Sequence, residues 1–211
     1  ISVQDAGEAI TIATWNVEDM DLGGEATAGT HESIARVIKE MSIEVIGLQE
    51  VQVDDIPKLQ ASLESIGWKM PHSAFWSPQA SASYTKPDGL AVLSKWPISE
   101  SGEAAPAAGQ IWPRSALRAR VAIGKGLDLY VCHVKSGTAT SDLSKRKAQV
   151  SALSQEIGEK YSASVTRFPV AVVGDMNTMG CVRDSSESID EDRTDGYPGH
   201  STLSLLESRD S

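Results

Sequence analysis

The chain has 211 residues, of which 40% are hydrophobic, and it carries a formal net charge of -10 at pH 7. This length and composition suit one α/β domain with a buried core, and no apolar stretch reaches the roughly eighteen residues of a transmembrane helix. The acidic balance argues against a strongly basic nucleic-acid-binding surface, because duplex binding draws on clustered Lys and Arg side chains.

The first part of the chain predicts strands and helices in alternation. A strand over residues 10–15 runs into Asn16, and a second strand over residues 43–48 runs into the pair Gln49 and Glu50. Each strand is followed by a segment with apolar residues at helical spacing. The predicted buried positions of these helices are Ile34, Val37, Ile38 and Met41 behind Thr30, and Ile56, Leu59, Leu63 and Ile66 before Gly67. An alternation of this kind is typical of α/β proteins.

Two more apolar strands follow. Residues 127–134 predict a strand in which period-two alternation places His133 and Lys135 on one face. A short apolar run later in the chain predicts a buried strand that stops at Asp175 and, two residues on, Asn177. Asp and Asn also favour turns for local hydrogen-bonding reasons, so a plain turn is the alternative at this last position.

The segments around these strands are read from composition. Residues 101–109 predict a loop, and residues 184–194 predict a second, acidic one. The basic run 145–147 lies in a helical pattern, where a solvated face is the expected location. The apolar positions that indicate this helix are Leu143, Val150, Leu153 and Ile157, and Leu203 and Leu206 indicate a short helix near the end.

The cysteines and the N-terminus leave the cellular location open. Cys132 is predicted to point away from the His133 face, as a packed core thiol. Together with Cys181 it makes two cysteines, too few for a disulfide framework, and the redox state of both stays open. The sequence starts at Ile1 rather than Met, so secretion or a periplasmic location after removal of a signal peptide stays open too.

Polar side chains at several strand ends predict a site at one edge of a sheet, because ligands of α/β proteins bind outside the strand ends. Hard divalent cations such as Mg²⁺ or Mn²⁺ prefer oxygen ligands and are often held by one or two carboxylates. Glu50 is therefore the first candidate for a metal ligand. Asn16 is expected beside it, orienting the carboxylate or a bound water, since a buried amide needs hydrogen-bond partners.

Four ordered motifs resemble the endonuclease/exonuclease/phosphatase superfamily, whose fold is that of deoxyribonuclease I. They are Thr14-Trp15-Asn16-Val17, Leu48-Gln49-Glu50, Cys132-His133-Val134-Lys135-Ser136 and Val173-Gly174-Asp175-Met176-Asn177. Residues 87–98 and 114–121 resemble further strands of the family, so the resemblance extends from residue 10 to about residue 178. It implies an α/β four-layer sandwich, two packed β-sheets flanked by helices, built as a single domain over residues 1–211.

The resemblance also implies roles for residues at the motif positions. In these roles Asp175 orients or deprotonates the attacking water, Asn177 holds a phosphate oxygen, and His133 binds or protonates the phosphate. Asp88 matches the position that orients the histidine, although Lys86-Pro87-Asp88-Gly89 is equally well explained as a β-turn.

Two basic side chains complete the implied site. Arg114 offers planar, permanently charged donors suited to phosphate, with loop capping as the alternative. Lys135 is a weaker candidate for the same task.

The sequence departs from the family near its end. The family closes its site with a Ser-Asp-His motif on a late strand, and no Asp-His dipeptide occurs in this sequence. The only later histidine, His200, is expected in a loop. The C-terminal strands are therefore expected to be missing, which leaves two alternatives: an incomplete piece of an enzyme, or a degenerate member that binds without cutting. The first strand would then have an open edge, which invites self-association.

The function implied is a metal-dependent phosphoester hydrolase, foremost a phosphodiesterase or nuclease that cleaves DNA or RNA by metal-assisted in-line attack of water. The alternatives are a phosphatase or lipid phosphodiesterase of the same superfamily, and the inactive binding module. The substrate stays open because specificity would lie in loops such as residues 75–86. The oligomeric state stays open as well.

Overall fold

The computed structural model describes residues 2–5, 8–18, 30–78, 89–104, 115–162 and 168–177, with side chains from Ile10 onward. The chain divides into two compact units. The first unit consists of Ile1–Ala104, Ser115–His133 and Thr166–Asp175, and the second of Ala105–Arg114, Val134–Val165 and Met176–Ser211. The predicted Asp88, Arg114, Cys181 and His200, the acidic loop and the last helix lie outside the described residues.

The first unit contains a five-stranded sheet with strand order β1-β2-β3-β5-β4. The strands are β1 (Ser2–Asp5), β2 (Glu8–Asn16), β3 (Val45–Val51), β4 (His72–Trp76) and β5 (Gly89–Ser94). β2 and β3 are parallel, and the other neighbouring pairs are antiparallel. The strands predicted at residues 10–15 and 43–48 are thus confirmed as β2 and β3.

A four-stranded sheet of order β6-β7-β8-β9 completes the strands of the first unit. They are β6 (Ile98–Ala104), β7 (Ala116–Val121), β8 (Leu127–His133) and β9 (Val170–Asp175), and only β8 and β9 run parallel. β8 ends at His133, one residue earlier than predicted, so strand alternation does not place Lys135.

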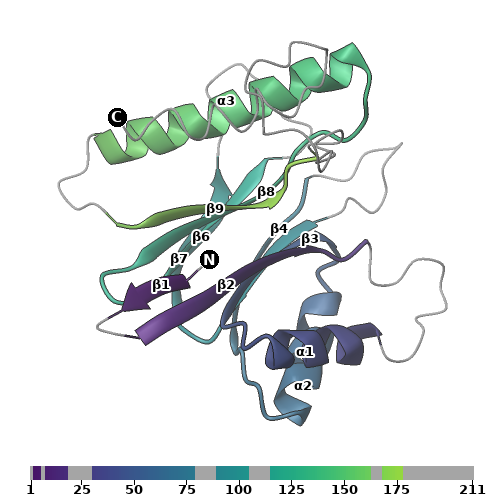
Figure 1. Ribbon diagram of the computed structural model, residues 1–211, viewed down its shortest axis with the longest axis vertical. Coiled ribbons are helices and arrows are strands. Elements are labelled where there is room, and N and C mark those ends of the chain that lie inside the picture. Colours follow the sequence, from purple (N-terminus) through teal and green to yellow (C-terminus); the bar gives the residue numbers. More distant parts are fainter. Residues whose placement is uncertain are drawn as a thin grey trace, which may run out of the picture. The chain divides into compact units, whose positions relative to one another are not determined.

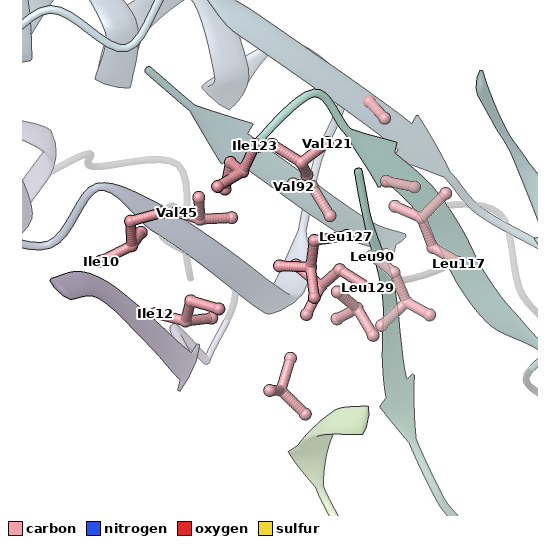
Figure 2. Packing of buried hydrophobic residues seen from close by; sticks show 14 residues of the cluster. Ile10, Ile12, Val45, Leu90, Val92, Leu117, Val121, Ile123, Leu127 and Leu129 are labelled. Carbon is pink, nitrogen blue, oxygen red and sulfur yellow. The ribbon is translucent and has the colours of Figure 1, made fainter. Parts of the chain in front are cut away.

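The two sheets pack face to face through one apolar core, shown in Figure 2. Side chains from both sheets meet in it, among them Ile12, Val92, Leu117 and Leu129. Gly47 on β3 allows a close approach, because a Cβ atom there would lie 2.7 Å from Val131 Cγ2. Alternating inward residues on two packed sheets give the sandwich that the sequence predicted.

Helices α1 (Thr30–Glu40) and α2 (Asp55–Ser65) pack on the other face of the five-stranded sheet, as Figure 1 shows. The predicted end of α2 is confirmed: Gly67 has φ +76°, and the Trp68 amide donates to the Leu63 carbonyl, as in a Schellman motif. The apolar face of α1 is narrower than predicted. Val37 is 38% exposed and Met41, just beyond the helix, is 64% exposed.

The described part of the second unit is dominated by helix α3 (Thr140–Ser162). The prediction that its basic run is solvated is wrong for Arg146, which is fully buried, while Lys145 and Lys147 are exposed. The Arg146 guanidinium donates to the carbonyls of Lys135 at 2.7 Å and Gly137 at 3.3 Å. Burial of this cation is possible because carbonyl oxygens replace its water.

Three further expectations about the sheets need correction. The loop predicted from residue 101 is β-structure up to Ala104, because β6 pairs along β7 as a strand with mostly exposed side chains and so lacks an apolar pattern. The open edge predicted for β2 is partly occupied, since β1 pairs with its first half from Ser2–Thr11 to Asp5–Glu8. Likewise β4 includes Phe75 and Trp76, the first residues of the predicted specificity loop.

Candidate active site

The polar strand ends of the first unit come from its two parallel strand pairs. In the five-stranded sheet Asn16 on β2 stands opposite Gln49 on β3. In the four-stranded sheet His133 on β8 stands opposite Asp175 on β9. Parallel neighbours end at the same edge, so each sheet delivers polar side chains from the carboxyl ends of two adjacent strands.

The amide of Asn16 joins the two sheets. Its Nδ2 donates to Glu50 Oε1 at 3.0 Å and to Asp175 Oδ2 at 3.0 Å, while its Oδ1 accepts from the Glu18 amide at 3.0 Å. A single neutral donor therefore holds two carboxylates, one from each sheet, close together. Asn16 is partly buried, and both polar atoms of its amide have hydrogen-bond partners.

The imidazole of His133 lies against the same two carboxylates. Its Nε2 is 3.5 Å from Glu50 Oε1 and 3.7 Å from Asp175 Oδ2. The His133 side chain is 4% exposed, whereas those of Glu50 and Asp175 are 24% and 31% exposed. The histidine is thus at the closed end of the group and the carboxylates are at its solvent side. Asn16, Glu50, His133 and Asp175 are called the carboxylate cluster below.

Glu50 reaches this cluster through an irregular backbone. Its φ is +54°, a left-handed conformation, and the pairing of β3 with β5 shifts register between Gln49 and Val51. One extra residue in an antiparallel pair, with left-handed backbone, is a β-bulge of the type that ordinarily uses Gly. A Glu in this position costs on the order of 1 kcal/mol or more, and such strain is typical of functional positions.

Asp175 is positioned by the glycine before it. Gly174 has φ +148°, and a Cβ atom there would lie 1.9 Å from the Cys132 carbonyl oxygen, so only glycine fits between β8 and β9. The predicted packing of Cys132 is confirmed, since this residue is 1% exposed. Burial raises the pKa of its thiol to about 12, and the Asp175 carboxylate adds to the increase.

The remaining predicted site residues lie in the second unit or outside the described residues. Asn177 has φ +46° and donates from Nδ2 to the Val134 carbonyl at 2.9 Å. The Lys135 ammonium donates to the Ser136 carbonyl at 2.6 Å and lies 3.4 Å from an Asp142 carboxylate oxygen. Of Asp88 and Arg114 the structure describes nothing.

The donor set of the carboxylate cluster fits a hard divalent cation. The described residues form no cage of three or more ligating His, Cys, Asp or Glu side chains. Magnesium requires none, because it keeps several waters and is commonly bound through one or two carboxylates plus substrate phosphate. Glu50 and Asp175 supply two partly exposed carboxylates that meet at one amide.

A family model with the description Endonuclease/Exonuclease/phosphatase family matches residues 13–187. The chain belongs to this family. Its members are hydrolases that act on phosphoester bonds and generally use divalent metal ions. Among curated proteins, none matches the sequence significantly.

Solved structures of family proteins show the same fold at low identity. Sphingomyelinase C from Streptomyces griseocarneus is 20% identical, with a TM-score of 0.61 over 93% of this chain and 69% of that one. The human Nocturnin catalytic domain is 22% identical, with a TM-score of 0.58 over 80% and 64%. An endonuclease/exonuclease/phosphatase protein from Beutenbergia cavernae is 19% identical, with a TM-score of 0.59 over 78% and 46%. This chain therefore spans about half to two-thirds of the length of these structures.

The fold predicted from the four motifs, two packed β-sheets with helices, is confirmed by these neighbours. Within the described ranges, no helix combines the length and apolarity that a membrane crossing requires.

Proposed function

We propose that the chain is a metal-dependent phosphoester hydrolase, foremost a phosphodiesterase or nuclease that cleaves by in-line attack of water. The observation that carries this proposal is the carboxylate cluster, in which two carboxylates and an imidazole meet around one amide. Two like charges held together by a neutral donor repel one another unless a cation or a proton intervenes. This repulsion lowers the stability of the folded protein, and a bound cation between the carboxylates and a reacting phosphate would relieve it.

Glu50 is the proposed metal ligand, and the family's use of divalent ions makes Mg²⁺ or Mn²⁺ the expected cofactor. A bound divalent ion supplies Lewis acidity, which stabilises the charge that develops on the phosphoryl oxygens. Asn16 fixes the Glu50 carboxylate through the 3.0 Å hydrogen bond and so presets its direction. No side chain of the cluster carries a permanent positive charge that could replace the ion.

The other residues of the proposal act on water and phosphate. Asp175, at the solvent side of the cluster, orients a water and accepts its proton as the water attacks phosphorus. His133 binds a phosphate oxygen or donates a proton to it, and its Nε2 lies 3.5 Å from Glu50 Oε1 and 3.7 Å from Asp175 Oδ2. Asn177, Lys135, Arg114 and Asp88 keep the phosphate-binding and orienting roles that the motifs imply.

Nucleic acid is the first substrate class of the proposal, and a small or lipid phosphodiester is the second. A specific observation favours testing the second: the formal charge is -10, and the one dense basic run loses Arg146 to the interior. Binding to duplex DNA depends on basic side chains that neutralise phosphates at the surface. The sequence has only 19 Lys and Arg residues against 29 Asp and Glu residues.

The test compares Glu50→Gln with Glu44→Gln in the hydrolysis of bis(p-nitrophenyl) phosphate and of labelled oligonucleotides, with Mn²⁺ and with excess chelator. Glu44 is a matched control, because it precedes the same strand and its side chain is also 24% exposed. We expect Glu50→Gln to lower kcat/KM by about 10³-fold, since ligation and charge are both lost, and Glu44→Gln to leave it within about twofold.

Undiminished turnover in chelator, or equal rates for the two variants, would overturn the metal role of Glu50. A protein that binds oligonucleotides but cleaves none of these substrates with Mn²⁺ would establish the inactive binding module in its place.

A further inference from the structure

The bulge at Glu50 has a second effect, on the residue before it. In a regular strand, consecutive side chains point to opposite faces of the sheet. Gln49 and Glu50 instead both bond to side chains on one face of β2: Gln49 to Thr14, and Glu50 to Asn16. Thr14 and Asn16 are two residues apart on a regular strand, so they do share a face. The left-handed backbone at Glu50 is what brings both side chains of β3 to that face.

The contact between Gln49 and Thr14 is built into the strand end. Gln49 Nε2 donates to Thr14 Oγ1 at 3.0 Å, and the hydroxyl lies 3.2 Å from Gln49 Oε1. Gln49 is 1% exposed, so its amide has lost its water and depends on this partner. Thr14, in contrast, is exposed. The pair therefore anchors the last regular residue of β3 directly before the bulge.

We propose that Gln49 is a positioning residue for the Glu50 carboxylate. Its hydrogen bond to Thr14 holds the left-handed backbone at Glu50. This backbone directs the Glu50 carboxylate toward Asn16, whereas a regular strand would direct it to the opposite face of the sheet. The inference rests on the metal role proposed above for Glu50. Its physical basis is preorganisation: a strained backbone persists only where surrounding contacts hold it, and a ligand that is already in place costs less to order when the ion binds.

Removal of the contact has an effect that a merely structural role does not produce. Without the Thr14 hydrogen bond, Glu50 can relax to an ordinary strand backbone, and its carboxylate then leaves Asn16. Partners that orient a metal ligand cost about 10- to 100-fold in metal affinity or activity when they are mutated. We therefore expect weaker Mn²⁺ binding and a higher Mn²⁺ requirement for catalysis, with kcat at saturating Mn²⁺ less affected.

The experiment measures Mn²⁺ binding by electron paramagnetic resonance for the wild type, Gln49→Met, Thr14→Val and the double variant. Gln60→Met is the matched control. Gln60 lies on helix α2, is half-buried, and also donates one amide hydrogen bond, to the Met70 carbonyl at 2.8 Å. We expect the Mn²⁺ Kd to rise about tenfold in Gln49→Met and in Thr14→Val, with no further rise in the double variant, and Gln60→Met to bind as the wild type does.

Crystal structures of the wild type and of Gln49→Met provide the second readout, with Thr14→Val in its place if Gln49→Met does not fold. The proposal is supported if Glu50 loses its positive φ or its bond to Asn16 in the variant. It is overturned if Glu50 keeps both, or if Gln49→Met and Thr14→Val bind Mn²⁺ as tightly as the wild type. A wild type that binds no Mn²⁺ overturns the metal role of Glu50, and the structures then decide the positioning alone.

Discussion

Two polar clusters of the first unit are built on neighbouring strands and differ in charge balance. The arginine cluster consists of Glu100, Arg118, Arg120 and Asp128, on β6, β7 and β8. Its fully buried Asp128 accepts from Arg118 Nη2 at 3.0 Å and from Arg120 Nε and Nη2 at 2.8 Å. Two cations there meet two carboxylates. In the carboxylate cluster, two carboxylates meet one amide and one imidazole.

The difference distinguishes a group that stabilises the fold from one that is prepared for a ligand. Burial lowers the pKa of Arg118, but the hydrogen bonds and charge of Asp128 outweigh burial, so the pKa of this guanidinium is raised on balance. Each charge of the arginine cluster is thus matched within the protein. The carboxylate cluster keeps an excess of negative charge at its solvent side, where a cation from outside can match it.

The largest expected effect is on the free energy of unfolding when one carboxylate of each cluster is replaced. Asp128→Asn leaves two largely buried guanidinium groups without their shared carboxylate, and we expect it to lower the free energy of unfolding by about 3 kcal/mol. Asp175→Asn removes one of two repelling carboxylates, and we expect a change within about 0.5 kcal/mol, or a gain. Urea denaturation at pH 7, followed by circular dichroism, measures both. Equal losses would mean that Asp175 belongs to a structural network like that of Asp128.

Backbone conformation sharpens the same comparison, because Glu50 is left-handed whereas Arg118, Arg120 and Asp128 lie in regular strands. Glycine adopts a left-handed backbone without the steric cost that alanine meets. We therefore expect Glu50→Gly to be more stable than Glu50→Ala by about 1 kcal/mol, with metal-dependent activity lost in both.

The exposed Arg36 in the middle of α1 provides the control for this pair. There the order should reverse, with Arg36→Ala more stable than Arg36→Gly by about 1 kcal/mol, because the backbone is helical. Thermal melting of the four variants measures which of Gly and Ala is more stable at position 50 and which is more stable at position 36. If Glu50→Ala equals or exceeds Glu50→Gly in stability, the left-handed backbone at Glu50 carries no strain.

The sequence predicts much of the fold, because strand periodicity and polar strand ends are local signals. The apolar runs before Asn16, Glu50 and Asp175 mark β2, β3 and β9, and their order in the chain carries the family resemblance. That polar side chains meet in pairs, from β2 with β3 and from β8 with β9, also follows from a physical rule, since parallel neighbours end at a common edge of their sheet. Neither inference requires knowledge of side-chain conformation.

The remaining features depend on tertiary contacts that no local pattern encodes. The bulge at Glu50 would be expected at Gly, so composition gives no sign of it. Its nearest signal is two consecutive polar residues, Gln49 and Glu50, at the end of an apolar strand. Arg146 is buried because carbonyls from residues 135 and 137 reach it, and a basic run alone predicts the opposite. β6 was missed because pairing with β7, rather than apolar side chains, makes it a strand.

The smallest expected effect concerns the core residue Cys132, whose thiol pKa is raised in part by the Asp175 carboxylate of the carboxylate cluster. Its thiol has a pKa of about 12 against an ordinary value of 9.0, first because of burial and second because of the Asp175 charge. The unfolded chain therefore loses this proton near pH 9 and the folded protein only near pH 12, so the stability that the protonated thiol contributes is lost as pH rises through this window.

At pH 8 the buried thiol stays protonated, because its pKa is raised to about 12, and thiolate is the form that reacts with disulfide reagents. In a Cys181→Ser background we expect the native protein to resist 5,5′-dithiobis(2-nitrobenzoate), while the urea-unfolded protein reacts at once. Adding Asp175→Asn removes only the second cause of the pKa increase, so labelling of the native protein should rise by no more than about threefold, since burial still disfavours the thiolate. Rapid labelling of the native Asp175→Asn variant at unchanged stability would contradict this expectation. It would show that the negative charge of Asp175, rather than burial, is the main cause of the raised pKa of Cys132.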